Sequence, residues 1–222
     1  MNLKDDITIK ALEIRNELKS EMDFDINPID LELSPVPPYM GSEAIKLIII
    51  GQDPTIRNIN SRKRITCTLN LNKENALKRY LNQVITYLDL SLENVYATNL
   101  FKYFYTIPPA DTINVLEAHF EKNLELLKVE MSHFPYAKII TLGEPVFRLL
   151  TSQEKFLKDY WDYNPKTKST DGNFTFVNTN KLGRPFFPFP HQPSLRKQFY
   201  RATLPVYLEF FKNTREMNFD FK

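Results

Sequence analysis

The segment that most constrains this chain is LIIIGQDPT, residues 47–55. Its four consecutive aliphatic residues predict a short strand that is buried on both faces. The run stops at Gly51, and Pro54 restricts the backbone of the preceding Asp53 to extended conformations. Open α/β folds bind their ligands at the carboxyl ends of parallel strands. We therefore expect Asp53 to be the centre of a site at one edge of a sheet.

Three further segments end in residues that suit such a site. Residues 94–100 and 137–143 predict strands that end at Asn99 and at the Gly143 turn. A third, proline-rich extended segment leads directly to His191. In a parallel sheet these ends lie along one edge, so an acid, an amide and an imidazole would converge there. Such a set can bind a polar planar ligand and provide electrostatic or acid–base assistance.

Amphipathic segments between the strands predict the helices that cover the sheet. Helices are expected at 3–22, 74–89, 111–131 (with Asp111 as N-cap), 145–150 and 197–213. Residues 64–69 and 174–177 are short and β-prone. The alternation of strands and helices favours a single domain over 1–222, in which 1–35 form a helix and a proline-rich lead-in. The expected fold class is α/β, with three α/β/α layers around a mainly parallel four-stranded sheet.

Charge and cysteine content narrow the possible functions. The chain has 29 basic and 27 acidic residues, so bulk charge alone does not predict a nucleic-acid partner. The single cysteine, Cys67, allows no internal disulfide and no four-cysteine metal site, and we expect it to be a small buried hydrophobe. There is no apolar signal-peptide core and no run of about 18 apolar residues. A cytoplasmic monomer without a membrane partner is expected.

Four short motifs, each after a strand-like segment, occur in an informative order. They are GQDP at 51–54, TNL at 98–100, LG at 142–143 and HQPSL at 191–195. In this order they resemble the motifs of the uracil-DNA glycosylase superfamily, and the resemblance covers about residues 36–213. It implies the three-layer fold of that family and an enzyme of base excision repair. Such enzymes flip a damaged nucleotide out of DNA and hydrolyse the bond between base and sugar.

The resemblance implies a role for each motif residue. Asp53 would stabilise the cationic sugar and position the attacking water, and His191 would donate a hydrogen bond to the uracil carbonyl that gains charge. Asn99 would read the edge of the base with its donor and acceptor. The other substrate-binding residues would be Gly51, Gln52, Pro54, Thr55, Cys67 and Thr68. No metal or other cofactor is implied.

The resemblance also implies contacts with DNA that contains a damaged base. Leu195, after Ser194, would fill the gap that the flipped nucleotide leaves. Arg57, Arg196 and Lys197 would contact phosphates. Without the family, these three cations together with Arg62 and Lys63 are most simply solvated surface charges. His119 and His133 are expected at helix surfaces or helix ends.

Several positions depart from the family pattern. Thr55 and Ile56 replace the aromatic residue and the histidine that follow GQDP in the enzymes that exclude thymine. Residues 65–68 contain no aromatic to stack on the base, so Phe101 or Tyr39 would have to do so. Gln192 is an insertion in the histidine motif. These departures favour an alternative, a catalytically weak or inactive nucleic-acid or nucleobase-binding protein on the same scaffold. An unrelated α/β hydrolase or nucleotide-binding protein is disfavoured because GxSxG, GxGxxG and GxxxxGK[ST] are absent.

Overall fold

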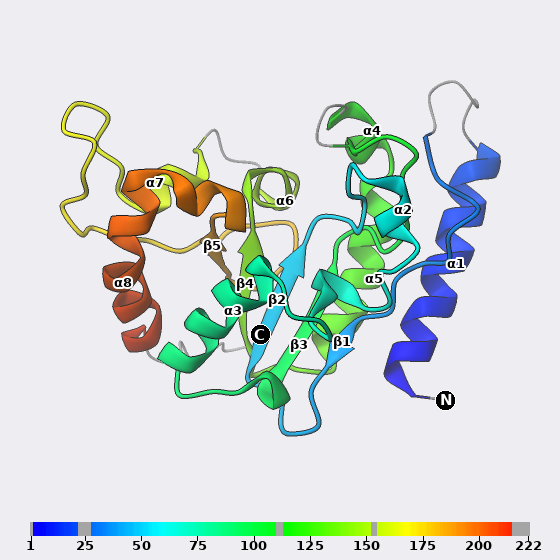
Figure 1. Cartoon of the computed structure of the whole chain (residues 1–222), viewed down its shortest axis with the longest axis horizontal. Coiled ribbons are helices and arrows are strands. Elements are labelled where there is room, and N and C mark those ends of the chain that lie inside the picture. Colours follow the sequence, from blue (N-terminus) through cyan, green and yellow to red (C-terminus); the bar gives the residue numbers. More distant parts are fainter. Residues whose placement is uncertain (1, 22–27, 110–112, 152–154, 215–222) are drawn as a thin grey trace.

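One sheet forms the centre of the protein. The computed structural model describes residues 2–21, 28–109, 113–151 and 155–214. Within them the strand order is β1-β3-β2-β4-β5 (Figure 1). The strands are β1 (Tyr39–Met40), β2 (Leu47–Gly51), β3 (Val95–Asn99), β4 (Lys138–Leu142) and β5 (Phe187–Phe189). Neighbouring strands from β3 to β5 are parallel, whereas β1 pairs antiparallel with β3. The four expected strands are therefore present, and the short edge strand β1 adds a fifth.

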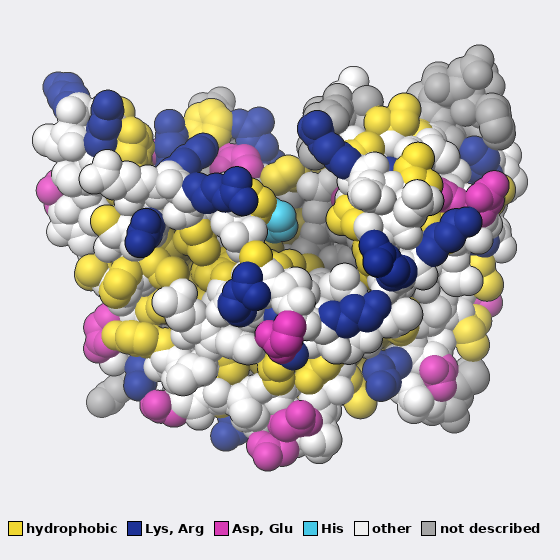
Figure 2. All heavy atoms as spheres, viewed as in Figure 1, with side chains coloured by type: hydrophobic (Ala, Val, Ile, Leu, Met, Phe, Trp, Pro, Cys, Tyr) yellow, Lys and Arg dark blue, Asp and Glu magenta, His cyan; other side chains and the backbone are white. Residues whose placement is uncertain are grey.

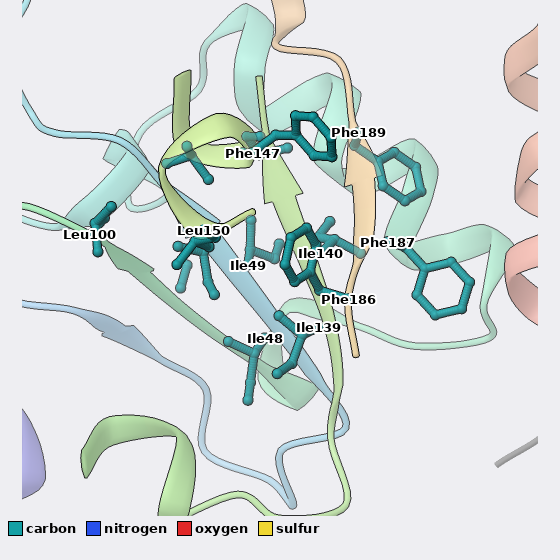
Figure 3. Packing of buried hydrophobic residues seen from close by; sticks show 14 of the residues in the cluster. Ile48, Ile49, Leu100, Ile139, Ile140, Phe147, Leu150, Phe186, Phe187 and Phe189 are labelled. Carbon is teal, nitrogen blue, oxygen red and sulfur yellow. The ribbon is translucent and has the colours of Figure 1, made fainter. Parts of the chain in front are cut away.

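The central strand β2 is buried along its whole length. Its aliphatic residues face helices on both sides, which explains why no polar residue alternates with them. Figure 3 shows the isoleucines of β2 and β4 packed against the phenylalanines of the β5 region. The register places Gly51 beside Asn99, so the ends of β2 and β3 lie side by side.

Helices cover both faces of the sheet. α3 (Ala76–Tyr87) connects β2 to β3, whereas α4 (Ile113–Ala118) and α5 (Phe120–Ser132) connect β3 to β4 in the opposite direction across the sheet. Because crossovers between parallel strands are right-handed, the two connections lie on opposite faces. α8 (Gln198–Asn213) contacts α3, and α1 (Leu3–Glu21) contacts α5 (Figure 1). The expected three-layer α/β/α fold class is confirmed.

Short helices complete the described chain. They are α2 (Ile59–Arg62), α6 (Glu144–Leu150), α7 (Leu157–Tyr160) and the 3-10 helices η1 (Thr68–Asn70), η2 (Leu92–Asn94) and η4 (Gln192–Arg196). Of the helices in the described ranges, none has the length and apolar character that crossing a membrane requires.

Two segments expected to be extended take other structures. Residues 64–69 form a loop that enters η1, where the backbone and side chain of Thr68 both donate to the carbonyl of Pro37 instead of to a strand. Residues 174–177 contribute only one isolated bridge, between Val177 and Phe186. Their β-branched and aromatic residues fit a pleated surface, but no neighbouring strand offers a ladder of partners.

The predicted helix at 111–131 is divided at His119 into α4 and α5, and its expected N-cap Asp111 lies outside the described residues. His119 is at a helix end, as expected, but it is fully buried and does not lie on a helix surface. Its ring stacks on that of Tyr105, with Nδ1 3.1 Å from the tyrosine hydroxyl. Burial lowers the pKa of His119 to about 4, so the ring is neutral at pH 7.

Candidate active site

A cavity of about 570 Å³ opens at the carboxyl ends of the central strands. Asp53 lines it from the loop after β2, and His191 lines it from the loop after β5. Figure 2 shows this face hollowed between two lobes, with lysine and arginine side chains on the surfaces around the hollow. The strand order reverses at β2, which is the position where open α/β sheets bind their ligands.

The carboxylate of Asp53 is held by its immediate neighbours. Oδ1 accepts a hydrogen bond of 2.7 Å from the backbone N–H of Thr55, and Oδ2 accepts one of 2.9 Å from Gln52 Nε2. Desolvation raises the pKa of Asp53 from its ordinary 3.8 to about 6, although these hydrogen bonds and the charge of Arg62 act in the opposite direction. Asp53 is therefore ionised at neutral pH, and its protonation changes close to the physiological range.

The loop that carries Asp53 is tied to the loop after β3. Arg62 is buried and donates to the carbonyls of Ile56 and Tyr105, each at 2.7 Å. Thr55 Oγ1 accepts from the backbone N–H of Tyr105 at 2.8 Å. The expectation that Arg62 is a solvated surface charge is wrong, because its guanidinium satisfies carbonyls that distant segments bring together.

Asn99, at the end of β3, lies next to Gly51, but it is not among the described residues that line the cavity. Its side chain is 1% exposed, and its Oδ1 has no hydrogen-bond partner among the described residues. A Cβ atom on Gly51 would overlap Asn99 Oδ1 and would lie 2.9 Å from Leu69 Cδ2. Glycine at this strand end therefore allows Asn99 and Leu69 to approach the turn that leads to Asp53.

The backbone around His191 is fixed from two sides. Tyr80 of α3 donates from its hydroxyl to the carbonyl of Pro190 at 3.2 Å, and the N–H of Gly143 donates to the carbonyl of Phe189 at 2.8 Å. Gly143 has φ +92°, and a Cβ there would lie 3.2 Å from His191 Cβ. The imidazole is exposed at the cavity wall, yet partial desolvation lowers its pKa. It is therefore neutral at pH 7 and can donate one hydrogen bond.

The segment after His191 forms η4. The N–H of Ser194 donates to the carbonyl of His191 at 2.8 Å, which closes the first turn. Ser194 and Lys197 line the cavity, whereas Arg196 is exposed outside it. Leu195 is half-buried and packs against the core. Its insertion into DNA stays a prediction.

Comparison with models of protein families matches residues 38–214 to the uracil DNA glycosylase superfamily. The chain belongs to this superfamily. The matched range runs from the residue before β1 to the end of the described chain, and it contains every residue that lines the cavity. The resemblance inferred from the motifs is thereby confirmed, and membership indicates a DNA glycosylase type of function and DNA binding. A comparison with curated proteins gave no match.

Some residues that the glycosylase motifs predict do not line the cavity. Cys67 is half-exposed, with Sγ 3.1 Å from Asn72 Oδ1, so it is not the buried hydrophobe that was expected. Thr68 is buried against the carbonyl of Pro37. Pro54 is buried behind Asp53, and Arg57 is exposed on the following loop. The binding roles proposed for these residues stay predictions.

Neither aromatic residue expected to replace the family's stacking residue reaches the cavity. Phe101 is fully buried in the core, and Tyr39 lies on the edge strand β1. Leu69 lines the cavity instead, from a left-handed backbone conformation with φ 56°. Sequence reasoning missed Leu69 because a non-glycine residue at positive φ has no local signal.

The second wall of the cavity was also missed. It is formed by residues from α6, α7 and α8 and their flanking segments, which include Glu144, Phe156, Leu157, Lys158 and Tyr200. These residues belong to no motif, and the packing of α6, α7 and α8 against the sheet brings them to the cavity. In the described part of the chain, no three His, Cys, Asp or Glu side chains cluster as metal ligands would.

Proposed function

We propose that this protein hydrolyses the N-glycosidic bond of uracil, or of a related damaged base, after the nucleotide has been flipped out of DNA. One observation carries the proposal. Asp53 and His191 line one cavity, and Asn99, with its unpartnered Oδ1, lies beside the glycine that begins the catalytic loop. A flipped base would place its polar edge toward Asn99 and its sugar toward Asp53.

Asn99 supplies the recognition of the base. A buried acceptor without a partner costs about 1–3 kcal/mol, and an imide N–H of a base would satisfy it. Uracil offers this N–H between two carbonyls, so the amide of Asn99 can accept from the N–H and donate to one carbonyl. The pairing favours uracil-like edges over cytosine, whose ring nitrogen at that position carries no hydrogen.

Asp53 and His191 supply the chemistry. As the bond from C1′ to the base nitrogen breaks, its electron pair stays on the base and the sugar becomes cationic. The Asp53 carboxylate, oriented by Thr55 and Gln52, stabilises this cation and accepts a proton from the water that attacks C1′. Neutral His191 donates a hydrogen bond to the base oxygen that becomes negative, which places a fixed dipole where charge develops.

The rate of base release is expected to depend on pH through Asp53. Protonated Asp53 can neither stabilise the cation nor accept a proton, and its pKa is raised to about 6. The single-turnover rate should therefore rise as the pH increases through about 6 and level off above pH 7. Single-turnover assays on a uracil oligonucleotide between pH 5 and 8 would measure this. A rate that is independent of pH across the range would contradict the role of Asp53.

The proposal is tested with oligonucleotides that carry one uracil, hypoxanthine or xanthine, assayed for abasic sites. Release of at least one of these bases, with no release from undamaged DNA, is the expected result. Thr55, the absence of an aromatic residue at 65–68 and the insertion of Gln192 favour the alternative of a non-catalytic binding protein. Salt-dependent binding of the same oligonucleotides without any product would support that alternative and overturn the enzymatic proposal.

Thr55 is expected to admit a 5-methyl group. Its side chain lines the cavity and is small, and its hydroxyl is held by the Tyr105 N–H. Thymine in a G·T mismatch should therefore be released at a measurable rate. Thr55→Tyr should raise the preference for uracil over thymine by roughly 10- to 200-fold, the range that one methyl group contributes in a pocket. Competition assays with U and T substrates would measure the ratio.

Thr55→Ser is the matched control, because it keeps the hydroxyl that accepts from Tyr105 and does not narrow the cavity. Its uracil-to-thymine preference should stay at the wild-type value. If wild type already rejects thymine as strongly as Thr55→Tyr does, another residue excludes the methyl group.

A further inference from the structure

A second hollow adjoins the candidate active site. It has a volume of about 730 Å³ and lies between residues 163–170 and the first half of α8. Lys158, Lys197 and Tyr200 line both hollows, so the two lie next to each other. We call the second hollow the α8 groove. The loop that forms its outer wall is the yellow segment beside α7 and α8 in Figure 1.

The α8 groove has the chemistry of a surface for unpaired nucleotides. Among the described residues that line it there are three lysines and no acidic residue, and the third lysine is Lys168. Tyr163, Phe199 and Tyr200 contribute aromatic rings, and hydroxyl groups come from Thr167, Ser169, Thr170 and Thr203. Proteins that bind single strands combine cations along the backbone with aromatic rings on which bases stack.

The aromatic rings of the groove contact one another and are half-exposed. The rings of Tyr163 and Phe199 meet edge to face with centroids 4.7 Å apart, and Phe199 meets Tyr200 in the same manner at 5.4 Å. Lys158 Nζ lies 5.5 Å from the centroid of Tyr163. All three rings are partly accessible to solvent, so a base can reach them.

The outer wall is a folded loop. The Asp162 carboxylate accepts hydrogen bonds of 3.0 Å from the N–H groups of Asp171 and Asn173 and one of 3.3 Å from Thr170 Oγ1. Asn164 pairs with Ser169 across the loop. The carboxylate of Asp162 is thus occupied within the loop, and the charged residues that line the groove in the described part of the chain are lysines.

We propose that the α8 groove binds unpaired nucleotides on one side of the damaged base, so that the protein prefers single-stranded DNA. The inference rests on the proposed function, since the groove adjoins the cavity that would receive the base. The aromatic rings stack on the neighbouring bases, and Lys168 and Lys197 contact their phosphates. Paired bases are stacked on one another and do not offer their faces to such rings.

The test measures binding of fluorescein-labelled single strands with one uracil to the full chain, in the Asp53→Asn background to prevent turnover. Two sets of strands carry several extra nucleotides, one set 5′ of the uracil and the other 3′ of it. The set whose extension reaches the α8 groove should bind more tightly than the other. Phe199→Ala should abolish this gain, with a loss of roughly 5- to 100-fold for the extended strand. Lys168→Gln should reduce the slope of log affinity against log salt by about 0.7.

Controls separate the groove from general charge and from folding. Lys166→Gln removes a lysine from the same loop outside the groove, and it should bind like the parent protein. Short strands with one nucleotide on each side of the uracil should bind all variants equally. The inference would be overturned if Phe199→Ala and Lys168→Gln lowered the affinity for short and extended strands equally. It would also be overturned if a duplex bound more tightly than the single strand.

Failure of the inference is distinguishable from failure of the proposed function. If wild type releases uracil but neither strand length nor Phe199→Ala affects binding, the inference alone fails. If no base is released while binding of the extended strand depends on Phe199 and Lys168, the enzymatic proposal fails and the groove stands as a single-strand site.

Discussion

Replacing Asp53 with asparagine is expected to lower the single-turnover rate of base release by roughly 100- to 10,000-fold, the usual contribution of a positioned acid or base. The amide keeps the size of the carboxylate and its acceptor toward the Thr55 N–H. It cannot carry the negative charge that stabilises the sugar cation, and it cannot accept a proton from water. Affinity for the substrate strand should change little, so the substitution should lower the rate of base release without weakening binding.

A second acid in the same cavity provides the matched control. Glu144 also lines the cavity, but its carboxylate lies 3.2 Å from Arg148 Nε and accepts from the Leu157 N–H at 3.2 Å. Glu144→Gln should therefore retain a rate within a few-fold of wild type. An equal loss of rate in both variants would show that the cavity needs negative charge in general, and it would contradict the assignment of Asp53.

The stability of the Asp53→Asn variant separates a catalytic loss from misfolding. The pKa of Asp53 is raised from 3.8 to about 6, so the folded state binds a proton more tightly than the unfolded state. The contribution of Asp53 to stability is then greatest below pH 4 and is lost as the pH rises through 6. At pH 7 the variant should unfold at the same or a higher temperature than wild type. A lower melting temperature at pH 7 would point to a structural role.

The strand ends were predictable because their signals are local. Four aliphatic residues before Gly51 predict a buried strand, and Pro54 identifies where it stops. The rule that ligands bind at the carboxyl ends of parallel strands then relates Asp53 to His191, although 137 residues separate them in the chain. The structure places both in the wall of one cavity.

The remaining wall was not predictable, because its residues reach the cavity through tertiary packing. Leu69 enters from a left-handed turn without glycine, and Arg62 is buried only because carbonyls from residues 56 and 105 surround it. Periodicity could not show the division between α4 and α5 at His119, since both halves continue the same apolar pattern. In each case the deciding contact lies with a segment that is distant in sequence.

A buried charge network lies beneath Asn99. Lys102 is 1% exposed, and its Nζ lies 2.5 Å from Glu130 Oε1 and donates to the carbonyl of Asn99 at 2.9 Å. Tyr96 donates to Glu130 Oε2 at 2.6 Å, and burial together with the charge of Glu130 raises the pKa of Tyr96. The network joins α5 to the end of β3 and so holds the backbone of Asn99 in place.

Lys102→Met is expected to lower the free energy of unfolding by about 3–5 kcal/mol, because it leaves Glu130 buried without a compensating charge. Urea denaturation at pH 7 would measure the loss. The double variant Lys102→Met with Glu130→Gln removes both charges and keeps an acceptor for Tyr96. It should be more stable than either single variant, since replacing a buried ion pair by neutral groups is far less costly than breaking it.

The exposed pair between Lys128 and Glu125, 2.8 Å apart, is the matched control. Lys128→Met should change the free energy of unfolding by less than about 1 kcal/mol, because water screens surface ion pairs. If Lys102→Met lowers the free energy of unfolding by no more than Lys128→Met does, then Glu130 becomes solvated or protonated at little cost. A double variant as unstable as the worse single variant would show that packing, and not the isolated charge, accounts for the loss. Either result would remove the argument that the buried pair holds Asn99 through electrostatics.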